Sequence, residues 1–196
     1  MGLPISLSFR NKKGSLFSSA FLCIGLFHSI FSQNQDFDSL YKEYKSGNYS
    51  HVARQSKLII QKDSSTERDL RFLVLYISTE NKIEEMDKML ETVYQSSDKR
   101  TAHLTNAMYL ILERALVANT QAIGEKWGYR FRQEAETSSR YADGLYYYAS
   151  LLFQNQKEKD AFFVSNLALN ANPNANLRNQ ILTLQSAINK IQANKK

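Results

Sequence analysis

Cysteine, proline and glycine are scarce in this sequence of 196 residues, which contains one Cys, two Pro and seven Gly. A single cysteine cannot close an intramolecular disulfide or build a cysteine-based zinc site, so disulfide-rich and zinc-ribbon proteins are disfavoured. The shortage of Gly and Pro disfavours an all-β fold with many tight turns, because such turns need residues that accept positive φ angles.

Hydrophobic residues make up 43% of the chain and charged residues 22%. Both values are close to the averages of globular proteins, so disorder throughout the chain is excluded. The length predicts one domain of ordinary size.

The first 32 residues have the pattern of a secretory signal peptide. Three basic residues at positions 10–13 precede an apolar run over 16–31, and the first acidic residue is Asp36. Ser32 is a small residue at a plausible cleavage position before Gln33. We therefore expect the leader to be removed and the protein to be periplasmic or secreted.

Alternatives for the leader remain open. The apolar run is about 16 residues long, shorter than the ~20 residues of a membrane-spanning helix. An uncleaved membrane anchor, which would be the only membrane contact, and a buried helix of a cytosolic protein are therefore less favoured. Lipidation of Cys23 fits poorly, because lipoprotein signals resemble a pattern with a small residue at the position of Leu22.

Cleavage would change the charge balance of the protein. The leader carries three of the 25 Lys and Arg residues and none of the 19 acidic residues, so its removal lowers the net charge from +6 to +3. Because the basic character is in part a targeting signal, it does not predict a nucleic-acid partner. The remaining 164 residues contain no cysteine, which excludes a thiolate nucleophile there.

After Asp36 the apolar residues recur every three or four positions, which predicts amphipathic helices. Short polar breaks at 45–48, 79–82 and 154–157 are typical of connections between antiparallel helices. Ser64 followed by Glu67 has the spacing of a capping box and predicts a helix start. The sequence Asn172-Pro173-Asn174 predicts a break between two further helices.

Residues 142–175 carry the clearest internal pattern. Two apolar groups flank a polar turn and are followed by a proline, namely Leu145, Tyr148, Ala149 and Leu152, then Ala161, Ser165, Ala168 and Leu169, then Pro173. This segment resembles the tetratricopeptide repeat (TPR), a helix–turn–helix unit of about 34 residues. The stretches 33–65, 67–98 and 100–140 keep similar spacing. They depart from the family at Leu40 and Val74, where a small residue is preferred, and at Met86, where alanine is preferred.

The resemblance implies an all-α fold in which TPR-like pairs over 33–175 stack as a right-handed α-solenoid. Residues 176–196 are expected to form a C-terminal capping helix and tail, because one apolar stripe runs through a helix rich in Asn, Gln and Lys. A helical bundle without repeats is the alternative.

Patterns for catalysis or cofactor binding are not found in the sequence. His51 and His103 have no His, Glu or Asp at helical spacing, so each is expected to have a packing or surface role. Trp127 and Phe131 share one helix face and are expected in the core, with Arg130 in solvent. No phosphate-binding loop or nucleophile motif occurs. We therefore expect no enzymatic activity, no cofactor and no metal.

TPR-like folds bind partners in a concave groove lined by the first helix of each pair. Aromatic and arginine residues, which are typical of interfaces, lie off the apolar stripes of those helices. The candidate partner-binding residues are Phe37, Tyr41, Tyr44, Arg68, Arg71, Tyr109, Tyr146 and Phe153.

An arginine beside aromatic rings suits a carboxylate. Arg68 and Arg71 therefore predict a protein or peptide partner that is acidic or ends in a free carboxylate. The expected function is an exported, non-enzymatic binding module that acts as a scaffold or adaptor. The alternative is a structural subunit of an envelope or appendage assembly.

Overall fold

The computed structural model describes residues 37–63, 69–98 and 101–194. These residues form nine α-helices and no strand, which confirms the all-α prediction for this part of the chain. The chain divides into two compact units, 1–40 and 41–196, of which the second holds nearly all the described residues. The predicted leader over 1–32 and the predicted capping box of Ser64 and Glu67 lie outside the described residues.

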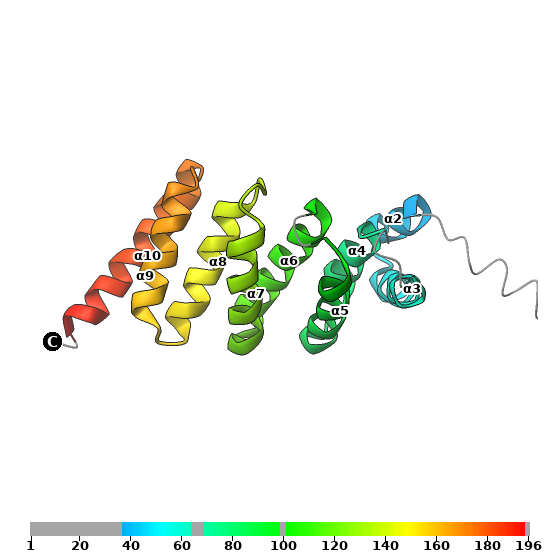
Figure 1. Cartoon of the computed structure of the whole chain (residues 1–196), viewed down its shortest axis with the longest axis horizontal. Coiled ribbons are helices and arrows are strands. Elements are labelled where there is room, and N and C mark those ends of the chain that lie inside the picture. The colour runs from blue at the N-terminus through cyan, green and yellow to red at the C-terminus, as the bar shows by residue number, and fades with distance from the viewer. Residues whose placement is uncertain (1–36, 64–68, 99–100, 195–196) are drawn as a thin grey trace, which may run out of the picture. The chain divides into compact units, whose positions relative to one another are not determined.

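The helices follow one another along the chain with short connections (Figure 1). Their bounds are α2 (Phe37–Lys45), α3 (Tyr49–Lys62), α4 (Arg71–Thr79), α5 (Ile83–Ser96), α6 (Ala102–Ala118), α7 (Gln121–Glu134), α8 (Tyr141–Gln154), α9 (Glu158–Asn170) and α10 (Ala175–Asn194). The predicted breaks at 45–48, 79–82 and 154–157 each contain an observed helix connection. The break at Asn172-Pro173-Asn174 is also confirmed, and the Asn174 side chain accepts a hydrogen bond from the Leu177 N–H at the start of α10.

Within the second unit, helices pack against their neighbours in sequence. The helices α4, α6, α8 and α10 contact one another in succession, while α7 packs between α6 and α8 and α9 packs between α8 and α10. The most extensive contact is that between α8 and α9, the pair that the sequence analysis identified as the clearest repeat. This packing order is compatible with a helical repeat protein.

The C-terminal core joins α8, α9 and α10. Ala149 and Ala161 are fully buried there, so small residues do allow these two helices to approach closely. From α10, Leu177, Ile181 and Ile188 are buried in the same cluster, whereas the rest of that helix is mostly exposed. The last helix thus covers the apolar face of α8 and α9.

Glycines allow α7 and α8 to pack at short range. A Cβ atom at Gly128 would lie 2.1 Å from the Tyr148 ring, and one at Gly144 would lie 2.2 Å from the Phe131 ring. Both glycines are buried in helices, where glycine is otherwise unfavourable relative to alanine. Close approach of the two helices accounts for their presence.

The pair α4 and α5 differs from α8 and α9. These two helices touch at few positions, and α4 packs instead along α3 and α6. Because α4 has neighbours on several sides, Phe72, Leu75 and Tyr76 are buried together with Leu73 and Ile77.

Candidate partner-binding site

The candidate partner-binding residues lie in different parts of the chain. Phe37 is a half-buried residue of the first unit, and Arg68 lies outside the described residues. The other six are in the second unit, where they belong to separate groups on α2, α4, α6 and α8.

Tyr41 and Tyr44 belong to an aromatic group at the N-terminal end of the second unit. Their ring centroids are 6.0 Å apart, and the Tyr44 ring lies 5.6 Å from the ring of Tyr49 at the start of α3. The Lys45 ammonium lies 5.1 Å from the Tyr41 ring centroid, within the range of a cation–π contact. Tyr41 and Tyr49 are exposed, so this group presents aromatic surface to solvent.

Arg71 is bound by a neighbour in its own chain. Its Nε lies 3.0 Å from both carboxylate oxygens of Asp69, and its Nη2 lies 2.7 Å from Oδ2. The guanidinium holds the pKa of the Asp69 carboxyl below its usual value, chiefly through these hydrogen bonds. A partner's carboxylate would have to compete with Asp69 for the Arg71 guanidinium. The sequence analysis selected Arg71 but did not consider Asp69.

Tyr109 and Tyr146 meet a residue that the sequence analysis did not select, Tyr147. The Tyr109 hydroxyl donates a hydrogen bond to the Tyr147 hydroxyl at 3.3 Å, and the two ring centroids are 5.5 Å apart. The Tyr146 and Tyr147 rings are 6.0 Å apart. Burial is the main cause that raises the pKa of the Tyr147 phenol. These residues form a tyrosine cluster between α6 and α8, in which Tyr109 is buried and the other two are half-buried.

Arg140 lies at the edge of the tyrosine cluster and was also missed. Its guanidinium carbon is 4.6 Å from the Tyr109 ring centroid, and the guanidinium forms no ion pair with any residue that the structure describes. Arg140 is exposed at the N-cap position of α8. No spacing rule within α8 pairs it with a tyrosine on α6, so the sequence carries no direct signal for this contact.

Arg140 lines an open cavity of about 530 Å³ between the start of α6 and the 137–140 loop. His103 and Asn106 face this cavity from α6, and the loop contributes hydroxyl groups. None of its lining residues is acidic. Among the described residues, the cavity therefore combines the unpaired charge of Arg140 with hydrogen-bonding groups, a setting that favours an anionic group.

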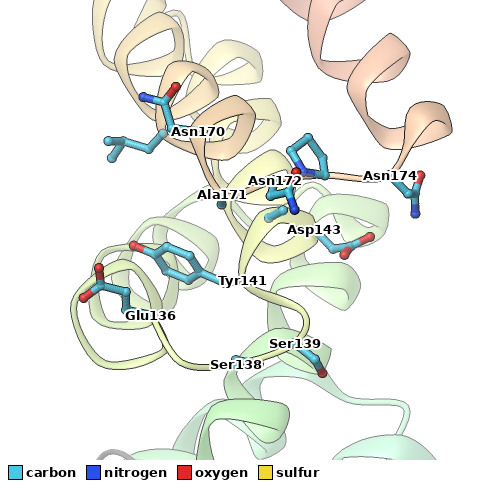
Figure 2. Close-up of a pocket in the computed structure, with 12 residues that line it drawn as sticks. Glu136, Ser138, Ser139, Tyr141, Asp143, Asn170, Ala171, Asn172 and Asn174 are labelled. Atoms are coloured by element: carbon cyan, nitrogen blue, oxygen red, sulfur yellow. The ribbon is translucent and has the colours of Figure 1, made fainter.

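A second open cavity of about 590 Å³ is lined by part of the same loop and is shown in Figure 2. Ser138 and Ser139 line both cavities. The second cavity also contains the carboxylates of Glu136 and Asp143, together with asparagine side chains from the connection between α9 and α10. The two cavities thus have opposite charge.

Phe153 lies on α8 beyond the tyrosine cluster. It is half-buried and, like Tyr146, packs against the C-terminal core. Tyr146 and Phe153 therefore contribute to core packing in addition to any contact that they make with a partner.

Trp127 and Phe131 are fully buried, as the sequence predicted, but Arg130 is not a solvated side chain. Its guanidinium carbon lies 4.7 Å from the Trp127 ring and 4.4 Å from the Tyr94 ring. It also forms two hydrogen bonds, at 2.7 and 3.0 Å, to the carboxylate of Glu91 on α5. The prediction that Arg130 is solvent-exposed was therefore wrong. Its acceptor Glu91 lies on α5, and a local sequence pattern cannot show that α5 lies opposite α7.

The described residues contain no group of three or more His, Cys, Asp and Glu residues that could hold a metal ion. His51 lies 3.5 Å from a carboxylate oxygen of Glu43. No described helix has the length and apolar character needed to cross a bilayer.

Comparison of the chain with protein-family models, with curated proteins and with solved structures gives no match.

Proposed function

We propose that this chain is an exported, non-enzymatic module that binds a protein or peptide partner and acts as a scaffold or adaptor. The helix pairs resemble tetratricopeptide repeats in sequence spacing, and their packing in neighbouring pairs supports that assignment. In this proposal the pairs stack as a right-handed solenoid with α10 as its cap, and cleavage near Gln33 releases the protein from the membrane.

The contact between Arg140 and Tyr109 carries the proposal. An exposed guanidinium that rests on an aromatic ring is held in position before a ligand arrives, so less side-chain entropy is lost when it binds. Its five N–H donors match the two oxygens of a carboxylate. The tyrosine cluster beside it supplies large rings with hydroxyl groups, which are the side chains that commonly anchor interfaces.

The proposed ligand group is therefore a carboxylate of the partner, as the sequence analysis expected, but bound at Arg140 rather than at Arg71. The cavity of about 530 Å³ beside Arg140 has room for such a group and for neighbouring backbone atoms. His103, Asn106 and the loop hydroxyls are available as further donors.

The test begins with the full chain, which is used to capture its partner from a native envelope extract for identification by mass spectrometry. The affinity of the purified partner is then measured by calorimetry for the parent protein and for Arg140→Ala. A hydrogen bond to a charged group contributes about 1.5–3 kcal/mol, so the affinity should fall about 10- to 150-fold. Arg178→Ala, at an exposed position of α10, serves as the matched control and should have no effect.

The source of the carboxylate is decided with two synthetic peptides that carry the partner's C-terminal sequence, one with a free and one with an amidated end. Loss of binding on amidation identifies a terminal carboxylate, whereas equal binding identifies an acidic side chain. An affinity that is the same for Arg140→Ala and for the parent protein would rule out this site.

A further inference from the structure

A second arginine of α7 lies near two exposed aromatic rings. The guanidinium carbon of Arg132 is 5.3 Å from the Tyr129 ring centroid and 6.0 Å from the Phe163 ring centroid. Tyr129 is 50% exposed and Phe163 is 54% exposed. Among the described residues, Arg132 has no carboxylate partner.

Arg130, two residues earlier on α7, has a similar aromatic environment and in addition binds a carboxylate. Its guanidinium also contacts two aromatic rings, and the Glu91 carboxylate of α5 binds it through two hydrogen bonds. Two residues correspond to a rotation of about 200° around a helix, so Arg130 and Arg132 project from nearly opposite sides of α7. The arrangement around Arg132 has the arginine and both rings but, among the described residues, no carboxylate.

Phe163 is not needed to fill the core. The adjacent Phe162 packs against the C-terminal core, and Val164 and Ala161 are buried in it, whereas Phe163 points away from that cluster and keeps half of its surface exposed. An exposed Phe beside a half-exposed Tyr and an arginine is typical of the anchoring residues of interfaces.

We infer that Tyr129, Arg132 and Phe163 form a second docking surface, which binds a helix of a different protein through one acidic side chain flanked by apolar residues. Charge complementarity supports this occupant, because the Glu91 carboxylate on α5 binds Arg130 in the way that the partner's carboxylate would bind Arg132. The chain would then hold two partners at once, one at Arg140 and one at Arg132.

A second copy of this chain is a poor occupant for the surface. On α5, the helix that supplies a carboxylate to Arg130, three of the four carboxylates are already bound within the chain. Glu85 pairs with Lys57, Asp87 accepts a hydrogen bond from Trp127, and Glu91 pairs with Arg130.

A polyanion such as a nucleic acid fits less well than a single carboxylate. The first turn of α9, which precedes Phe163, carries Glu158 and Asp160 beside a single lysine, Lys159, so it lacks the row of positive charges that a row of phosphates needs. Asp160 itself forms no ion pair with Arg132 among the described contacts. One partner carboxylate near the two rings needs only the charge of Arg132.

The test uses a phage library of random 12-residue peptides, selected on the purified protein expressed from its full coding sequence and counter-selected on Arg132→Ala. Peptides that bind only the parent protein should carry an Asp or Glu next to aromatic or aliphatic residues. For the best peptide, made synthetically, we expect Arg132→Ala to weaken binding at least tenfold and Phe163→Ala at least threefold. Replacement of the peptide's acidic residue by its amide should cause a loss similar to that of Arg132→Ala.

Arg178→Ala serves again as the matched control, and unchanged melting temperatures show that the variants are folded. Failure to select any peptide that depends on Arg132, or selection of peptides without an acidic residue, would overturn the inference. Displacement of the peptide by oligothymidylate, or a dimer in sedimentation velocity that Arg132→Ala dissociates, would overturn the assigned occupant. Binding at Arg140 is measured separately, so the proposal for each surface can be refuted independently of the other.

Discussion

The ring of Tyr148 on α8 lies directly against the backbone of Gly128 on α7, so that an added Cβ atom would be 2.1 Å from Cδ2 of the ring. No real contact is that short, and the ring is held by the buried core around it. The distance between α7 and α8 therefore depends on the absence of a side chain at residue 128.

Gly128→Ala should destabilise the protein. Alanine favours a helix by about 1 kcal/mol relative to glycine, but overpacking a tight interface costs about 1–3 kcal/mol, and here the clash is with a ring. We expect a net loss of about 1–2 kcal/mol in the free energy of unfolding, measured by urea denaturation. Gly124→Ala meets only the tip of the Leu151 side chain, which can move, so its loss should be smaller. A Gly128→Ala protein that is more stable than the parent would contradict the close approach.

Two isoleucines of α10 test whether this helix covers the core of α8 and α9. Ile181 is fully buried and Ile191 is 37% exposed. Ile181→Ala should cost about 2–4 kcal/mol of stability through the lost burial and the cavity that remains. Ile191→Ala should change stability by about 0.5 kcal/mol or less. Equal effects on the thermal unfolding midpoint would show that α10 does not protect the core in solution.

The pair of Glu91 and Arg130 should make stability depend on pH in the acid range. Hydrogen bonds from Arg130 are the main cause that lowers the pKa of the Glu91 carboxyl to about 2, from an ordinary value of 4.5. As the pH falls below about 4.5, the unfolded chain takes up a proton at this residue before the folded chain does. The contribution to stability is therefore complete above pH 4.5 and is lost as the pH approaches 2.

Urea denaturation of the parent protein and of Glu91→Gln between pH 7 and pH 2.5 measures this effect. The parent should be the more stable of the two at pH 7, and the difference should shrink steadily below pH 4.5. Glu84→Gln, at an exposed position of the same helix, is the matched control. A difference that stays constant down to pH 2.5 would refute the assignment to this ion pair.

Arg71→Ala should weaken partner binding much less than Arg140→Ala. Asp69 already occupies the Arg71 guanidinium, and an exposed pair of this kind contributes about 0–1 kcal/mol. Asp69→Asn releases Arg71 and should, if anything, strengthen the binding of an acidic partner. The comparison is made by calorimetry with the captured partner. A loss at Arg71 that equals the loss at Arg140 would return the binding site to α4, as the sequence analysis expected.

The N-terminus of the native protein tests the predicted export. Edman degradation or intact-mass measurement should read Gln33 as the first residue, because cleavage is expected after Ser32. An intact Met1 terminus on soluble cytosolic protein would contradict export and would restore the full charge of +6.

Local patterns were sufficient to predict most of the helices. The predicted polar breaks at 45–48, 79–82 and 154–157 and the break at Pro173 each coincide with an observed connection, whereas no break was predicted between α6 and α7. The buried positions of Trp127 and Phe131 follow from the three- and four-residue spacing of apolar side chains. These features depend on residues close to one another in the sequence, where helical geometry fixes which side chains share a face.

Contacts between helices could not be predicted in the same way. Arg130 binds Glu91 on α5, Arg140 rests on Tyr109 of α6, and Arg132 contacts Phe163 of α9, and all of these cross from one helix to another. The number of neighbours around α4 also decides which of its faces are buried, and a single helical pattern contains no information on that number. The pair of Asp69 and Arg71, by contrast, was within reach of a local argument.

The loose pairing of α4 and α5 has a consequence for the order in which the protein opens. Because α5 touches α4 at few positions, polar contacts contribute to its attachment in addition to its buried apolar side chains. These contacts are those of Glu85 with Lys57 and of Asp87 and Glu91 with α7. Such contacts are screened by salt more than apolar burial is. Amide hydrogens of α5 should therefore exchange with solvent sooner than those of α8 and α9, and sooner still as ionic strength rises. The salt concentration of the surrounding compartment would therefore control how readily α5 opens locally, while the C-terminal core of α8, α9 and α10 stays closed.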